Sequence, residues 1–131
     1  MKIIASAITV ALVLCGAACD KNTTQGPGGK RLTLTQPADQ TLKRGETNEI
    51  AISIGRDNFT GPVQVRFEKL PRGVEAVQSK DIAADQTRVV YTLHAANDAD
   101  LVQKHEAVVV AQGPEGMATR QTFLVTVEDK P

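Results

Sequence analysis

Apolar and polar residues alternate strictly in several short runs from residue 31 onward, and this pattern constrains the fold more than any other feature. A period of two places every second side chain on the same face of a β-strand, so each run predicts a strand with one buried face. No stretch of the chain shows sustained helical spacing. The apolar members of the five clearest runs are Leu32 and Leu34, Ile50 to Ile54, Val63 to Phe67, Val89 to Leu93, and Phe123 to Val127.

Two further segments complete the predicted set of strands. Residues 107–111 are apolar at every position, which is typical of a strand in the middle of a sheet, whereas residues 74–77 resemble a weaker edge strand. Turns with Pro followed by Gly lie at residues 70–73 and 113–116, and the second predicts a hairpin. About seven short strands joined by turns predict one all-β domain over residues 31–128, an immunoglobulin-like or fibronectin-III-like β-sandwich.

Composition limits both the core and the partners of this domain. The 131 residues include three Phe, one Tyr and no Trp, so the core must be mainly aliphatic. Lys and Arg together number 15, as do Asp and Glu, so no charge excess favours nucleic acid, and we expect no nucleic-acid partner. The two cysteines both lie in the first 19 residues, so the domain has no disulfide to support it.

The N-terminus has the pattern of a secretory signal, which we assign to residues 1–18. Lys2 precedes an apolar stretch that runs from Ile3 to Leu14, interrupted only by Ser6 and Thr9. About 20 apolar residues are needed to span a bilayer, so this stretch is too short for a transmembrane helix.

The end of this signal, Leu12-Val13-Leu14-Cys15-Gly16-Ala17-Ala18-Cys19, resembles the lipobox of bacterial lipoproteins. The resemblance implies cleavage before Cys19, acylation of Cys19 with palmitate or a similar chain, and a lipid anchor in a bacterial membrane, facing the periplasm or the exterior. The sequence departs from the family at Gly16, where Leu is usual. The alternative is an ordinary signal peptide cleaved near Ala17 or Ala18. Residues 19–30 contain no large apolar side chain after Cys19, which predicts a flexible linker.

A second resemblance covers most of the remaining chain. Gly45, the alternating isoleucines of residues 50–54, the turn Leu70-Pro71-Arg72-Gly73-Val74 and the closing strand of residues 122–127 resemble an immunoglobulin-like domain of planctomycete surface and secreted proteins. The resemblance implies a sandwich with an adhesive or spacer role and without an active site. The chain departs from the family pattern in carrying one copy, and in having His105-Glu106 where an aromatic residue often begins the penultimate strand.

Residues with catalytic or metal-binding chemistry are sparse. His94 and His105 are the only histidines, and neither has a second His or a Cys at ligand spacing. We therefore expect no catalytic residue, no zinc and no cofactor. Asn97, Asp98 and Asp100 form the one cluster of oxygen ligands, for which calcium is the alternative to an ordinary role in capping a loop.

These observations predict a non-enzymatic, lipid-anchored envelope protein that binds a protein or a polysaccharide through exposed loops or an edge strand. One alternative is a structural stalk or accessory subunit that positions a partner at the membrane. Another is a secreted carbohydrate-binding module, although the chain lacks the flat aromatic platform common in such sites. Arg56, Phe59 and Asp98 are the candidate binding residues, and Phe59 is either a plug at one end of the sandwich or an exposed contact.

Overall fold

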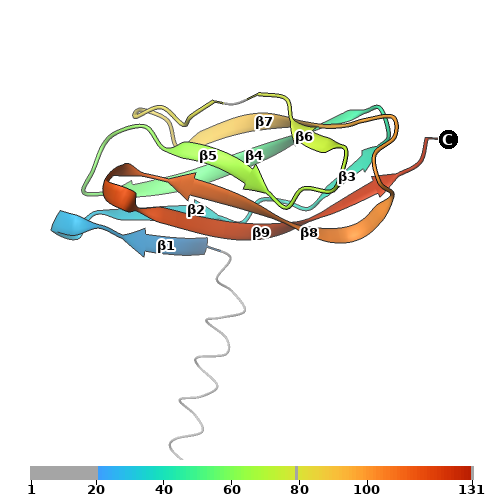
Figure 1. The fold of residues 1–131 in the computed structure, drawn as a ribbon. Coiled ribbons are helices and arrows are strands. Elements are labelled where there is room, and N and C mark those ends of the chain that lie inside the picture. Colours follow the sequence, from blue (N-terminus) through green and yellow to red (C-terminus); the bar gives the residue numbers. More distant parts are fainter. Residues whose placement is uncertain (1–20, 79, 131) are drawn as a thin grey trace, which may run out of the picture.

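The computed structural model describes residues 21–78 and 80–130, so the predicted signal peptide and Cys19 lie outside the described residues. The described chain forms two β-sheets that face each other (Figure 1). Short 3-10 turns at Pro27–Gly29 and Pro114–Gly116 close two of the hairpins. The strands are β1 (Lys21–Gln25), β2 (Arg31–Thr35), β3 (Gln40–Lys43), β4 (Thr47–Asp57), β5 (Gln64–Glu68), β6 (Val74–Ala76), β7 (Arg88–Ala95), β8 (Val102–Gln112) and β9 (Ala118–Glu128).

The strand order defines the fold. One sheet has the order β1-β2-β4-β7-β6 and the other has the order β3-β9-β8-β5. Strands β2, β4, β7 and β6 correspond to the A-B-E-D sheet of immunoglobulin domains, and β5, β8 and β9 correspond to the C-F-G sheet. Strand β3 lies parallel to β9 and thereby moves the chain from the first sheet to the second. The protein is therefore an all-β, immunoglobulin-like sandwich, which confirms the predicted fold class.

The core lies between the sheets and is built from the apolar positions of the alternating runs. Ile52 on β4 faces Val89 on β7 in the register of the first sheet, and Val125 on β9 is fully buried in the second. Phe67 packs edge-on against both Tyr91 and Phe123, with ring centroids 5.6 and 6.1 Å apart. Each such buried side chain contributes about 1.5–3 kcal/mol to stability, so aliphatic packing with a few aromatic contacts is enough for a domain of this size.

Residues 107–111 of strand β8 are buried on both faces, as their continuous apolar run predicts. The strand lies between β9 and β5, and its outward residues Val108 and Val110 are only 5% and 3% exposed. A salt bridge from Arg120 on β9 to Glu68 on β5, with an N–O distance of 2.7 Å, passes over the outer face of β8. In the strand register Arg120 is the neighbour of Val110 and Glu68 is the neighbour of Val108. Long charged side chains at such positions can bury their aliphatic stems against apolar residues.

The segment predicted as a flexible linker is structured from Lys21 onward, which corrects the expected start of the domain at residue 31. Strand β1 pairs with β2 over its whole length, and the hydroxyls of Thr23 and Thr33 are 2.9 Å apart. Asn22 donates a side-chain hydrogen bond to the carbonyl of Arg120. An edge strand can be held by backbone pairing and short polar side chains, so the lack of large apolar residues does not prevent it.

Strand β3 is the other element that the sequence pattern does not indicate, because Leu42 is its one large apolar residue. Gln40 begins the strand and is only 4% exposed. Its side-chain amide donates to the carbonyl of Ala38 and accepts a 2.7 Å hydrogen bond from Asn48. A buried amide with both polar atoms satisfied fits in this core as well as an apolar side chain does.

Candidate functional site at the edge of strand β5

The loop residues expected to bind a partner lie at opposite ends of the sandwich. Arg56 is near the end of β4, whereas Asp98 lies between β7 and β8. Because Thr47 at the start of β4 pairs with His94, the Asp98 connection lies near that start. Ten residues of strand then separate it from Asp57, a distance of about 33 Å. The three candidates therefore do not form one site.

Arg56 and Phe59 have roles inside the fold. The Arg56 guanidinium donates to four backbone carbonyls, with 2.9 Å to Gly61, 2.8 Å to Ala83, and further bonds to Ile82 and Gln86. Phe59 is partly buried and packs against the hydrophobic core, so it acts as the end plug that was one of its two predicted roles.

In the cluster of oxygen ligands predicted at residues 97–100, Asp98 and Asp100 both contact Arg72. Arg72 forms a 2.8 Å salt bridge with Asp100, and it donates a 3.1 Å hydrogen bond to the backbone carbonyl of Asp98. The bond to Asp100 raises the pKa of the Arg72 guanidinium. Across residues 21–78 and 80–130, no group of three or more His, Cys, Asp and Glu side chains is arranged to hold a metal ion.

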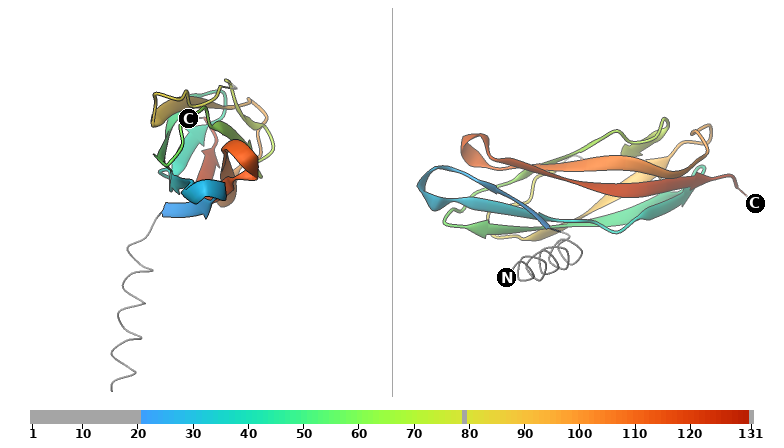
Figure 2. Two further views of the ribbon diagram at one scale, coloured as in Figure 1. Left: turned by 90° about the vertical axis from the view of Figure 1, so that its left-hand side faces the viewer. Right: turned by 90° about the horizontal axis from the view of Figure 1, so that it is seen from below.

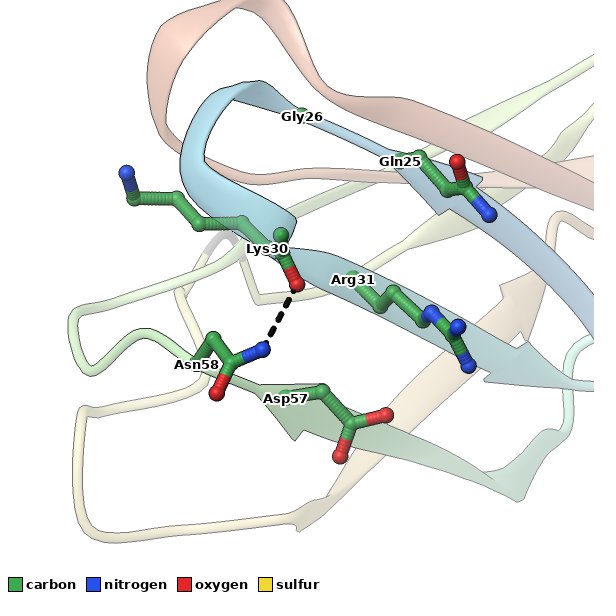
Figure 3. A pocket seen from close by; sticks show the side chains of 7 residues that line it. Gln25, Gly26, Lys30, Arg31, Asp57 and Asn58 are labelled. Carbon is green, nitrogen blue, oxygen red and sulfur yellow. Dashed lines mark hydrogen bonds between the residues drawn. The ribbon is translucent and has the colours of Figure 1, made fainter.

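A polar cleft lies beside the β1–β2 hairpin (Figure 3). It has a volume of about 420 Å³. Asn58 donates 2.8 Å to the carbonyl of Gly29, and Lys30 forms a 2.8 Å salt bridge with Glu115. These contacts fix the hairpin against the ends of β4 and β8, and no aromatic ring lines the cleft. The lining residues are Gln25, Gly26, Gly29, Lys30, Arg31, Asp57 and Asn58.

Side chains block the open edge of β9. Residues 118–124 of β9 have no strand beyond them in the described part of the chain, because β3 pairs only with residues 125–128. The side chain of Asn22 donates to the carbonyl of Arg120, and that of Gln36 donates 2.9 Å to the carbonyl of Thr122. Asp39 accepts a hydrogen bond from the N–H of Leu124. Because these three backbone groups of β9 are already hydrogen-bonded, they are not available to pair with the strand of another chain.

Strand β5 forms the edge of the same sheet on the opposite side and has no such protection. The N–H and C=O of Val63 both bond to Ile82, so they point away from β8. Backbone groups of alternate residues point to the same side of a strand, so those of Val65 and Phe67 also point away from β8. Among the described residues, no further strand or side chain bonds to them.

An apolar groove of about 300 Å³ adjoins this edge, between β5 and β6. Its floor and walls include the partly buried side chains of Val65, Phe67 and Leu70, together with the ring of Tyr91. Burial raises the pKa of Tyr91 to about 12, and its hydroxyl donates 2.7 Å to the carbonyl of Lys80. The remaining lining residues are Arg66, Glu75, Ala76 and Gln78.

Three charged side chains meet on the outer face of this sheet: Arg66 and Glu68 from β5, and Arg120 from β9. The Nε atom of Arg66 bonds to Glu68 at 3.0 Å, and Arg120 bonds to the other carboxylate oxygen. The hydrogen bond from Arg66, together with the charge of Arg120, lowers the pKa of Glu68. Two arginines thus share one glutamate on this face.

The β5 edge is therefore the candidate site, and sequence reasoning did not identify it. The alternation of residues 63–67 correctly predicted a strand, but alternation is the same in central and edge strands. The signal that could have suggested an edge is the polar, charged character of every outward position in residues 64–69.

The comparisons with known proteins were made on both sequence and structure. No protein-family model matches the sequence. No curated protein matches it either. Solved structures that resemble the chain include a complex of titin M10 with an obscurin-like 1 Ig domain, 17% identical over 84% of this chain and 99% of that one, with a TM-score of 0.46.

Two other solved structures also resemble the chain. The titin domains Z1Z2 in complex with telethonin are 18% identical over 76% of this chain and 48% of that one, with a TM-score of 0.46. A twitchin kinase fragment from C. elegans, which has kinase and immunoglobulin domains, is 10% identical over 88% of this chain and 22% of that one, with a TM-score of 0.45. The fold assignment given above rests on the strand order of the chain itself.

Proposed function

We propose that this protein is a non-enzymatic, lipid-anchored component of a bacterial envelope that binds a protein partner at the β5 edge. The observation that carries the proposal is the contrast between the two ends of one sheet. The β9 edge is covered by β3 and by three polar side chains, whereas β5 presents free backbone groups beside an apolar groove. Exposed sheet edges with adjoining pockets are a common site for binding peptide segments.

The position of β1 supports an anchor on the side away from this edge. Strand β1 begins two residues after Cys19 and forms one edge of the five-stranded sheet, whereas β6 forms the other edge. Four strand spacings of about 4.8 Å separate them. Figures 1 and 2 show β1 along one long side of the sandwich and β6 on the opposite side. A lipid at Cys19 would thus leave the groove facing away from the membrane.

The lining of the groove favours protein over polysaccharide. Sugars usually bind to flat, exposed aromatic rings and paired polar groups. In this groove the hydroxyl of Tyr91 is occupied by the Lys80 carbonyl, and Phe67 is partly buried against the core. No helix among the described residues has the length and apolar character needed to cross a bilayer. We propose that a lipid at Cys19 attaches the protein to the membrane.

Lipidation is tested by metabolic labelling with a fatty-acid probe. The wild-type chain should carry the label, and the Cys19→Ser variant should not. A Cys15→Ser variant is the matched control and should be labelled like the wild type, because Cys15 leaves with the signal peptide. Equal labelling of the wild type and Cys19→Ser would contradict the lipid anchor.

Partner binding is tested by crosslinking in the intact envelope, with wild type, Val65→Pro and Val65→Ala compared. Proline removes the N–H that faces the free edge but takes nothing from the pairing with β8, so the sandwich should still fold. Val65→Ala retains the N–H and is the control. A crosslinked species that Val65→Pro loses and Val65→Ala retains supports the proposal. Identical crosslinks in all three proteins would favour the stalk or accessory role instead.

A further inference from the structure

We propose that the partner contributes an extended strand to the β5 edge, with an acidic residue between two apolar residues, and that Arg66 selects this pattern. The inference rests on the proposed function and specifies the chemistry of the partner. It follows from which backbone groups are free, which face each partner side chain must occupy, and which charges are already present there.

The free backbone groups of β5 match the spacing of a strand. Val65 and Phe67 are two residues apart, so their N–H and C=O groups are separated by about 6.8 Å, the repeat of an antiparallel ladder. Both residues lie in regular strand paired with β8 on the other side. The neighbouring bridge between Val63 and Ile82 shows that this same edge accepts an antiparallel partner.

The groove determines the partner side chains that oppose Val65 and Phe67. Residues directly opposite each other in a sheet project from the same face. Val65 and Phe67 line the groove between the two sheets, so the partner residues opposite them also enter it. With Leu70, Ala76 and Tyr91 forming the remaining apolar lining, these two positions suit Val, Ile or Leu.

The residue between them lies on the outer face, beside Arg66. The Arg66 side chain is 55% exposed, with Nε bonded to Glu68 and Nη1 bonded to Gln112 at 2.9 Å. No contact within the described residues uses its Nη2 atom. Arg66 and Arg120 share the one carboxylate of Glu68, so an acidic partner residue at this position would give Nη2 of Arg66 a carboxylate of its own.

A second copy of this chain fits the edge poorly. The antiparallel register that uses the free groups of both Val65 and Phe67 in each copy places Arg66 directly opposite the same arginine of the other copy. Like charges directly opposite in a sheet are destabilising. The charge pattern therefore favours a different chain, with an acidic residue where β5 has its arginine.

The test uses the mature chain in detergent micelles and two synthetic peptides, acetyl-Ser-Thr-Val-Glu-Val-Thr-Ser-amide and its analogue with Lys in place of Glu. Binding is followed by NMR of the backbone amides and by titration calorimetry. The Glu peptide should bind about two- to fivefold more tightly than the Lys peptide, the difference expected from one cross-strand charge pair. Both should shift the amides of Val65 and Phe67, and Val65→Pro should abolish both interactions.

Arg66→Gln should remove the preference for the Glu peptide. Arg88→Gln is the matched control, because Arg88 is an exposed arginine on the other sheet, and it should keep the preference. Melting curves verify that both variants are folded. Equal affinities for the two peptides in the wild type, tighter binding of the Lys peptide, or no binding of the Glu peptide would overturn the inference. The envelope crosslinking experiment tests the proposed function independently of these peptides.

Discussion

Arg56 connects three parts of the chain through one guanidinium group. It projects from the end of β4 and donates to the carbonyl before β5 and to three carbonyls in the segment that leads to β7. The fixed, planar geometry of its donors suits this role, because a lysine has one nitrogen and could reach fewer of the carbonyls. Arg56, which the sequence suggested as an exposed binding residue, therefore has a structural role in the fold.

Replacing Arg56 should therefore destabilise the protein. We expect Arg56→Ala to lower the free energy of unfolding by about 2–3 kcal/mol, because several partly buried carbonyls lose a charged donor. Arg56→Lys should recover part of this loss. Arg88→Ala, at an exposed position, should stay within about 0.5 kcal/mol of the wild type. Urea unfolding measures all three, and an Arg56→Ala value near that of Arg88→Ala would contradict the assigned role.

Tyr91 makes the stability depend on pH in the alkaline range. Burial, with a smaller effect of Asp81, raises its pKa to about 12 from the ordinary value of 10.0. The folded state therefore retains the phenol proton where the unfolded state loses it. The resulting stabilisation is fully present below pH 10 and is lost as the pH rises from 10 through 12.

The corresponding prediction compares the wild type with Tyr91→Phe. The unfolding free energy of the wild type should decrease more steeply between pH 10 and 12 than that of Tyr91→Phe, which has no phenol proton to lose. Near pH 7 the variant should be less stable by about 1 kcal/mol, because it lacks the hydrogen bond to the Lys80 carbonyl. Denaturant unfolding over this pH range provides the measurement, and parallel pH profiles for the two proteins would exclude the assignment.

At the scale of elements, the β1–β2 hairpin closes one side of the sandwich. Strand β1 pairs with β2 in the first sheet and reaches β9 of the second through the bond from Asn22 to the Arg120 carbonyl. The same bond protects the edge of β9. The hairpin is thus both an edge strand and a cover for the neighbouring sheet, and it leaves β5 as the unprotected edge of the second sheet.

A chain that begins at Arg31 should fold but be less stable than the mature chain. Loss of the β1 ladder and of the Asn22 bond should reduce the free energy of unfolding by about 1–3 kcal/mol, since each hydrogen bond has a small net value and ordering the segment has a cost. The Asn22→Ala variant should show a smaller decrease. Thermal and urea unfolding provide the comparison, and equal stability with and without residues 20–30 would restore the linker interpretation.

At the scale of the whole molecule, the two sheets share one core. Side chains from both sheets meet in one continuous cluster, so loss of packing in either sheet should be felt by the entire domain. Two further features connect the sheets. Val63, before β5, forms an antiparallel bridge with Ile82, before β7, and the chain crosses from one sheet to the other between β2 and β3.

Ile52→Ala on one sheet and Val125→Ala on the other should each cost about 2–4 kcal/mol, because both side chains are completely buried. Gln64→Ala, an exposed position on β5, should change stability by no more than about 0.5 kcal/mol. Circular dichroism and the fluorescence of Tyr91 should report one coincident transition in each protein, unaffected by EDTA. Separate transitions for the two probes would show that the sheets unfold independently.

Much of the fold could be predicted from the sequence, because the controlling signals are local. The alternation of Ile50, Ile52 and Ile54 decides which face of β4 is buried, and the continuous run of residues 107–111 indicates a strand in the middle of a sheet. The hairpin at Pro114 follows from turn chemistry within four residues. Each of these properties depends on neighbours along the chain, so no knowledge of distant contacts is needed.

Other features were decided only by tertiary structure, because they depend on residues far apart in sequence. Strand β1 exists through its pairing with β2, and Arg56 has a structural role through carbonyls up to 30 positions away. The candidate site depends on the same kind of contact. Val65 and Phe67 belong to an exposed edge because β8 occupies one side of β5 and, among residues 21–78 and 80–130, no strand occupies the other. Alternation determines the face of a strand, but only the assembled sheet determines its neighbours.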